Sequence, residues 1–183
     1  PASTAVAKLA ARLHDDQPRI VGVTALSNSF AAARSVCRQV KEAAPAIITV
    51  LGGIHGTLLY EDILSECEEI DVVVRGEGEA AFPELVAAVA AGTPPDGIAG
   101  ISFRRSGKPV HNPGRELAPD LDALPLPAHH LVENAPYRTR SISSSRGCPH
   151  HCRFCSIRAL YDGAIRVRST VSLTEEIQVL LRQ

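Results

Sequence analysis

Short apolar runs rich in β-branched residues alternate with amphipathic segments through the first half of the chain. Three of these runs have the composition of strands buried on both faces: IVGVTAL (20–26), AIITVLGG (46–53) and DVVVRGEGE (71–79). Apolar residues recur at helical spacing in the segments around them, at roughly 5–13, 30–43, 60–68 and 82–92. Strands and helices that alternate in this order predict an α/β fold with a parallel sheet covered by helices.

Glycines follow the second and third expected strands directly. Gly52 and Gly53 end the second strand, and Gly76 and Gly78 follow the third. Open parallel sheets bind ligands at the carboxyl ends of their strands, so these glycines lie where a ligand is expected. Taken alone, the same glycines are equally compatible with simple tight turns.

Composition and charge indicate which classes of protein this chain can belong to. Of the 183 residues, 45% are hydrophobic and 21% are charged, which is typical of a chain that forms a core. The 19 Lys and Arg residues nearly balance the 20 Asp and Glu residues, so a general nucleic-acid-binding surface is not expected. No apolar run approaches the ~20 residues of a membrane span. Because the N-terminal segment also lacks the apolar stretch of a secretory signal, we expect a cytoplasmic protein.

After the last of these helices, the alternation of strands and helices ends. GIAGISFRRSGKPV (97–110) predicts a hairpin that turns at Ser106-Gly107, and LDALPLPAHH (121–130) has the prolines of an extended connector. A further strand is expected at 140–145, and Ser172 with Glu175 has the spacing of a capping box before a last amphipathic helix. We therefore expect three parts, at residues 1–97, 98–136 and 137–183.

Three cysteines fall within eight residues in the segment SSRGCPHHCRFCSIR (144–158). Cys148, Cys152 and Cys155 have C-x3-C-x2-C spacing, and cysteines this close together are typical of iron–sulfur sites. Zinc with His150 or His151 as fourth ligand fits less well, because both histidines lie inside the cysteine loop and no second cysteine pair exists. The alternative to any metal site is that the three cysteines are unligated thiols. The two other cysteines lie alone on apolar helix faces and are predicted to be buried thiols: Cys37 and Cys67.

The same segment resembles the signature of the radical S-adenosylmethionine (SAM) family, since Phe154 precedes the last cysteine and SRGCP follows an expected strand. The resemblance implies that Cys148, Cys152 and Cys155 bind three irons of a 4Fe–4S cluster, whose fourth iron is left for the amino and carboxylate groups of SAM. It places Phe154 near the adenine. In this family the reduced cluster cleaves SAM to methionine and a 5′-deoxyadenosyl radical, which abstracts hydrogen.

The residues before the cysteines resemble the cobalamin-binding domain that precedes the radical SAM domain in one class of these enzymes. Thr24-Ala25-Leu26 is similar to the Ser-x-Leu element of that domain, and Gly52-Gly53 to its Gly-Gly element. LGGIHGT, VVRGEGEAAFPELV, LDALPLP and RVRS are similar to further stretches of these enzymes. The resemblance implies that the following residues line the slot for the nucleotide tail: Thr24, Leu26, Gly52, Gly53, Gly76, Glu77 and Gly78. His55 is expected at the ligand's periphery rather than on cobalt.

The chain departs from the family pattern at both ends. The Asp-x-His-x-x-Gly element that supplies an axial histidine in many cobalamin domains is absent. Only 28 residues follow Cys155, whereas a complete β/α barrel needs ~250. With no Met in the sequence, we expect an internal fragment: a Rossmann-like cobalamin-binding domain without its first β/α unit, then the first β/α unit of a radical SAM partial TIM barrel.

The resemblance implies a cobalamin-dependent radical SAM enzyme that transfers a methyl group to an unactivated carbon or phosphorus centre. Its cofactors would be cobalamin, SAM and a 4Fe–4S cluster, and its partners a small-molecule substrate and an electron donor such as flavodoxin or ferredoxin. Cyclisation or oxidative ring chemistry is the alternative within the class. A non-catalytic corrinoid carrier or sensor would have no use for the clustered cysteines, and a zinc-stabilised interaction module would have no use for the glycine loops.

Overall fold

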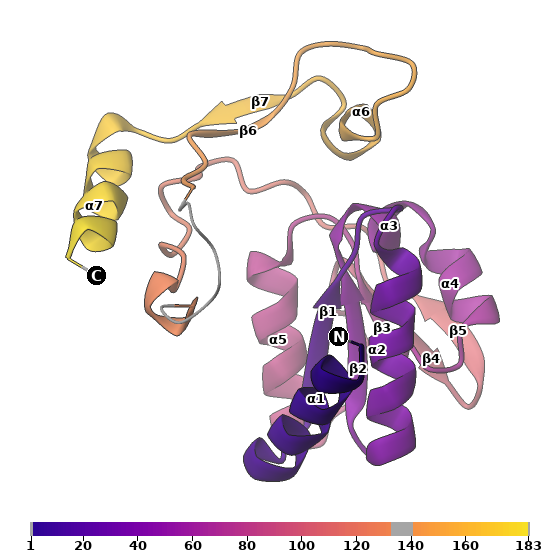
Figure 1. Cartoon of the computed structure of the whole chain (residues 1–183). Coiled ribbons are helices and arrows are strands. Elements are labelled where there is room, and N and C mark those ends of the chain that lie inside the picture. Colours follow the sequence, from indigo (N-terminus) through magenta and orange to yellow (C-terminus); the bar gives the residue numbers. More distant parts are fainter. Residues whose placement is uncertain (1, 133–140, 183) are drawn as a thin grey trace. The chain divides into compact units, whose positions relative to one another are not determined.

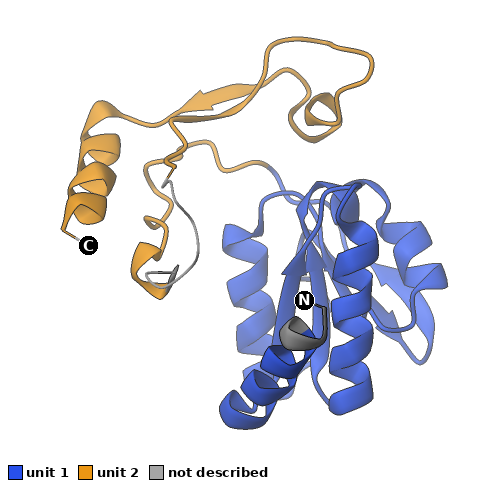
Figure 2. Ribbon diagram, in the orientation of Figure 1, with its two compact units in different colours: residues 1–116 blue, residues 117–183 orange. Residues whose placement is uncertain are grey.

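The computed structural model describes residues 2–132 and 141–182 (Figure 1). The chain forms two compact units, Pro1–Glu116 and Leu117–Gln183 (Figure 2). None of the helices in the described ranges is long and apolar enough to cross a membrane.

The first unit is a five-stranded sheet with helices on both faces. The sheet has the order β1-β2-β3-β4-β5, in which β1, β2 and β3 are parallel while β4 and β5 continue antiparallel. The parallel part confirms the expected α/β alternation. The elements of this unit are α1 (Ala2–Asp16), β1 (Ile20–Thr24), α2 (Phe30–Ala43), β2 (Ile48–Gly52), α3 (Gly53–Leu58), α4 (Tyr60–Glu66), β3 (Val72–Val74), α5 (Gly78–Ala91), β4 (Ile101–Arg105) and β5 (Lys108–His111).

Alternate residues of β2 and β3 point to opposite faces and build two cores. Leu51 and Val73 pack with Leu64 of α4 on one face, and Val50 and Val72 pack with Leu85 of α5 on the other. Each fully buried side chain of this size contributes about 1.5–3 kcal/mol to folding. These two strands are therefore buried on both faces, as the sequence predicts.

The first strand differs from its prediction. β1 lies at an edge of the described sheet and is only half buried, with Gly22 and Thr24 exposed. Its run of apolar residues has the composition of a buried strand, but composition alone does not specify which neighbours cover it.

The predicted hairpin belongs to the first unit rather than to the linker. β4 pairs with β3 and β5 pairs with β4, and the turn lies at Ser106-Gly107 as expected. Ile101 and Phe103 are buried in the core on the α5 face of the sheet. Because this burial holds the hairpin on the sheet, the boundary between the units falls after Glu116, whereas the sequence placed it after residue 97.

The second unit contains η1 (His129–Val132), β6 (Ser145–Gly147), α6 (Ile157–Tyr161), β7 (Ile165–Val167) and α7 (Thr170–Leu181). Along the chain β6 is followed by α6, β7 and α7, and β7 pairs antiparallel with β6. Within the described part of 140–145, the predicted strand begins only at Ser145. Ser169, not Ser172, caps α7: its hydroxyl accepts a hydrogen bond from the Ser172 backbone N–H at 3.1 Å. The helix therefore starts one turn earlier than the capping-box pattern indicated.

An ion pair in the first unit makes stability depend on pH. Glu69 is largely buried and accepts hydrogen bonds from Arg34 Nε at 2.6 Å and Arg38 Nη2 at 3.3 Å. Burial by itself raises the pKa of Glu69, but the hydrogen bonds from Arg34, Arg38 and the backbone, together with the positive charge of Arg34, outweigh it and leave the pKa below its usual value.

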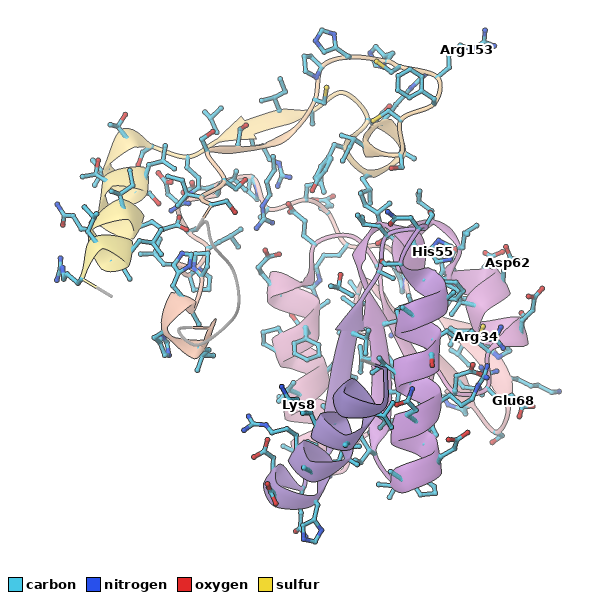
Figure 3. The ribbon with its side chains drawn as sticks, in the orientation of Figure 1. Lys8, Arg34, His55, Asp62, Glu68 and Arg153 are labelled. Carbon is cyan, nitrogen blue, oxygen red and sulfur yellow. The ribbon has the colours of Figure 1, made fainter. Side chains whose placement is uncertain are left out.

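We therefore expect the free energy of unfolding to fall as the pH drops below about 4.5 through the folded-state pKa of Glu69, because the unfolded state binds more protons there. Denaturant unfolding of the Glu69→Gln variant should show a weaker acid dependence than the parent. Glu68→Gln, at an exposed neighbour (Figure 3), is the matched control and should keep the parental slope. Equal slopes for parent and Glu69→Gln would contradict this assignment.

Candidate functional site

Three loops meet at the carboxyl ends of β1, β2 and β3. Ala25 N–H donates to Gly52 O at 3.1 Å, and His55 N–H donates to Ala25 O at 3.2 Å. Gly76 N–H donates to Thr57 Oγ1 at 3.0 Å. The loop after β1, helix α3 and the loop after β3 are thus tied into one surface. Thr57 is the last residue of the LGGIHGT stretch, and its hydroxyl joins the second and third loops, a role that the sequence did not predict.

The adjacent glycines Gly52 and Gly53 have different roles. Gly53 has a φ of +88°, and a Cβ there would lie 2.6 Å from Thr24 Oγ1 and 2.7 Å from Ala25 O. Gly53 is therefore needed for the contact between two loops, and a bulky residue there is expected to disturb the fold as well as the slot that the sequence assigned to it. Gly52 has a φ of −122°, and a Cβ there would meet nothing within 4 Å. The space at this edge of the sheet is beside Gly52.

The loop after β3 also leaves space. Gly76 has a φ of +73°, and a Cβ there would meet nothing within 4 Å. Glu77 is the N-cap residue of α5 and Gly78 is its first residue. On the other side of the surface, Thr24 and Leu26 are exposed, Leu26 to 55%. An exposed leucine beside open glycines suits a large, partly apolar ligand.

His55 lies at the same edge, in α3 (Figure 3). Its Nδ1 is 3.1 Å from Ser27 Oγ, and its ring centroid is 4.1 Å from that of Phe30. Burial lowers the pKa of His55 below its usual value, so the ring is neutral at pH 7 and can both donate and accept hydrogen bonds. Ser27 and Phe30 hold this ring, and no motif in the sequence marks either of them.

The three clustered cysteines lie on one loop of the second unit, which follows β6. Cys152 is exposed, Cys148 and Cys155 are half buried, and none is in a disulfide. Cys155 N–H donates to Cys152 O at 3.1 Å, which forms a turn between these two residues. Phe154 is 93% exposed, and Arg153 projects from the outer part of the loop (Figure 3).

Within the described ranges, no three His, Cys, Asp or Glu side chains are arranged to hold a metal ion. The structure therefore brings the three thiols onto one loop without gathering them at one centre. The donor set itself suits an iron–sulfur cluster, since three free thiols lie outside the core on a segment of eight residues. His150 and His151 are exposed on the same loop.

The two isolated cysteines are buried, as predicted. Cys37 is 0% exposed and Cys67 is 3% exposed, and both belong to the core between the sheet and α2 and α4. Burial raises the pKa of the Cys37 thiol to about 11 and also raises that of Cys67. Neutral buried thiols of this kind are packing residues and poor metal ligands.

Residues 1–86 match the family model of the B12 binding domain. An uncharacterized methyltransferase of Pyrococcus horikoshii, PH0819, is 36% identical over 168 residues, which cover 89% of this chain and 37% of the relative. The anaerobic magnesium-protoporphyrin IX monomethyl ester cyclase of Rubrivivax gelatinosus is 36% identical over 178 residues, covering 91% and 32%. The cobalamin-dependent radical SAM methyltransferase TokK of Streptomyces tokunonensis is 28% identical over 176 residues, covering 91% and 26%. The chain thus spans about a third of these relatives.

Among solved structures, the chain is similar to the cobalamin-dependent S-adenosylmethionine radical enzyme OxsB with aqua-cobalamin and S-adenosylmethionine bound. The TM-score is 0.77 at 20% identity, and the match covers 97% of this chain and 25% of that chain. This likeness extends through both units and shows that the chain has the same fold. With the matched domain, the open glycine edge and the cysteine loop in one polypeptide, the chain belongs to the family of proteins that join a B12-binding domain to a radical SAM domain.

Proposed function

We propose that this chain supplies the cobalamin site and the cluster-binding loop of a cobalamin-dependent radical SAM methyltransferase. The observation that carries the proposal is the presence, in one chain, of an open glycine-lined sheet edge and a C-x3-C-x2-C loop. A corrinoid carrier needs only the first of these features, and a zinc module needs only the second.

In the first unit, the space beside Gly52 and Gly76 would take the nucleotide tail of cobalamin. Thr24 and Leu26 would line one side of the slot, and Glu77 and Gly78 at the start of α5 the other. Gly53 would act indirectly, because it allows the first two loops to approach each other. The neutral ring of His55 would meet the periphery of the ligand through a hydrogen bond.

In the second unit, Cys148, Cys152 and Cys155 would hold a 4Fe–4S cluster, and the exposed ring of Phe154 would lie against the adenine of SAM. When bound, the cluster supplies the electron that cleaves SAM and generates the substrate radical. Three thiolate ligands leave one iron free, which is why a fourth protein ligand is not required. The loop would have to tighten around the cluster, because its thiols are not gathered in this structure.

We propose methyl transfer to an unactivated carbon or phosphorus centre of a small molecule, because two of the three relatives described above are named as methyltransferases. Ring formation is the second candidate, since the similarity to the cyclase is as high as that to the first methyltransferase.

An electron donor such as flavodoxin or ferredoxin would reduce the cluster. Because free thiols and a reducible cluster persist in a reducing compartment, we place the protein in the cytoplasm.

Anaerobic reconstitution of the full-length protein with iron and sulfide tests this proposal. We expect about four irons per chain, a brown colour that dithionite bleaches, and one bound cobalamin. Stoichiometric zinc after native purification, with no iron uptake, would contradict the proposal and favour the zinc-stabilised module. Bound cobalamin without any iron would favour the carrier or sensor.

A further inference from the structure

Helix α7 buries one carboxylate, that of Glu176. Its side chain is 1% exposed, whereas the neighbouring Glu175 is exposed. Glu176 Oε1 accepts a hydrogen bond from His129 Nε2 at 2.9 Å, and Oε2 accepts one from Arg168 Nη1. Removing a carboxylate from water costs several kcal/mol unless such partners compensate. If this position were needed only for packing, an apolar side chain could fill it without the free-energy cost of removing a charge from water.

Arg168 connects this carboxylate to the strand that enters the cysteine loop. Its Nη1 also donates to Ser143 O at 3.3 Å, and its backbone N–H donates to Ser144 O at 2.9 Å. Its Nη2 donates to Ser172 Oγ at 2.8 Å. The Arg168 side chain is 11% exposed, so most of these bonds are shielded from water. Arg168 therefore joins α7 to the two residues just before β6.

The position of strand β6 determines the position of Cys148, the first cysteine of the loop. β6 ends at Gly147, which pairs with Ile165 of β7 and is followed directly by Cys148. Gly147 has a φ of +97°, and a Cβ there would lie 1.9 Å from Ala164 O, so the two ends of the loop touch through their backbones. A shift of β6 cannot be absorbed at this contact and would move Cys148.

The connector before the cysteine loop is held by the same elements. The Asp122 carboxylate accepts from Ser169 N–H at 3.0 and 3.1 Å, and Ala118 O accepts from Arg166 Nη1 at 2.6 Å. His129, in η1, adds its bond to Glu176. Two points of the connector, Asp122 and His129, and Ala118 just before it are thus held by β7 and the α7 segment, and His129 is held by the buried carboxylate of Glu176.

We propose that Glu176 is a positioning residue for the iron–sulfur cluster: through Arg168 and His129 it fixes the strand that ends at Cys148 and anchors the connector to α7. This inference rests on the proposed function. It assigns a role to residues that touch neither the cluster nor SAM.

The charge of Glu176 is central to this role. Burial by itself raises the pKa of Glu176, but the hydrogen bonds from Arg168 and His129 outweigh it and keep the pKa below its usual value. The group is therefore ionised at neutral pH and accepts from both partners. A glutamine of the same shape would present an NH₂ group to one of these two donors.

The test uses the full-length protein with Glu176→Gln, and Glu175→Gln as the matched control on the same helix. We expect Glu176→Gln to keep cobalamin bound in the first unit and to take up iron. Its dissociation constant for SAM should rise on the order of tenfold, the size of effect seen when partners of ligating residues are changed. The change that SAM produces in the electron paramagnetic resonance (EPR) spectrum of the reduced cluster should also differ from that of the parent. Glu175→Gln should match the parent in every measurement.

A double variant, Glu176→Leu with Arg168→Met, separates positioning from stability. Apolar residues of similar volume can replace a buried ion pair without loss of stability. We expect this variant to unfold at the parental temperature but to keep the weakened SAM binding and the altered EPR response. Parental SAM binding in the double variant, or in Glu176→Gln, would overturn the proposal. A double variant that fails to fold would also overturn it, because the network would then be needed for the fold itself.

These outcomes are distinct from failure of the proposed function. If the parent protein itself takes up no iron, the cluster assignment fails and the positioning role fails with it. If the parent binds cluster and SAM while Glu176→Gln does so equally well, only the positioning role is wrong.

Discussion

Replacing any one of Cys148, Cys152 and Cys155 by alanine in the full-length protein is expected to abolish 5′-deoxyadenosine formation from SAM. Each thiolate would be a direct ligand of a cluster that must keep one iron free, so the loss of one leaves only two protein ligands. Cobalamin binding should persist in all three variants, because the glycine loops belong to a separate compact unit. Anaerobic assays of 5′-deoxyadenosine, with cobalamin measured by absorbance, report both properties.

The buried cysteines provide the matched controls. Cys37→Ala and Cys67→Ala remove small buried side chains and should cost about 1 kcal/mol of stability each, while SAM cleavage is retained. If Cys37 or Cys67 proved essential while a loop cysteine was dispensable, the ligand assignment would be wrong, and the radical SAM assignment with it.

Gly52→Leu is expected to weaken cobalamin binding at least about a hundredfold, equivalent to about 2.7 kcal/mol, while the first unit stays folded. The backbone at Gly52 has a φ that any residue can adopt, and a Cβ there meets nothing within 4 Å. The leucine side chain would therefore occupy space that the proposed ligand needs, without disturbing the protein. Circular dichroism and titration with cobalamin would measure the two effects separately.

Two further variants make this prediction specific. Gly53→Leu should unfold or strongly destabilise the first unit, because its φ is +88° and its Cβ would overlap Thr24 Oγ1 and Ala25 O. Gly114→Leu changes an exposed glycine that also has open space around it and lies outside the three loops, so its affinity for cobalamin should be parental. Unchanged affinity in Gly52→Leu would remove Gly52 from the site.

The sequence pattern alone identifies the main helices and strands of the first unit and the three thiols that are candidate metal ligands. Helical periodicity predicted α2 and α5, and short continuous apolar runs predicted β2 and β3, because each pattern reflects which faces of its own element are apolar. The C-x3-C-x2-C spacing identified the loop and separated it from Cys37 and Cys67, whose apolar neighbours marked them as core residues. These are local properties, and a single sequence is enough to read them.

Only the tertiary structure shows the features that depend on contacts between residues far apart in the sequence. Two adjacent glycines have different roles, because a Cβ would overlap Thr24 and Ala25 only at Gly53. The hairpin joins the sheet because Ile101 and Phe103 find a core formed by residues far away in the chain. Glu175 and Glu176 are adjacent glutamates in the sequence, and only Glu176 is buried, where Arg168 and His129 reach its carboxylate from other segments. Periodicity describes one element at a time, whereas the free energy of a buried charge or of a missing Cβ depends on which other elements pack against it.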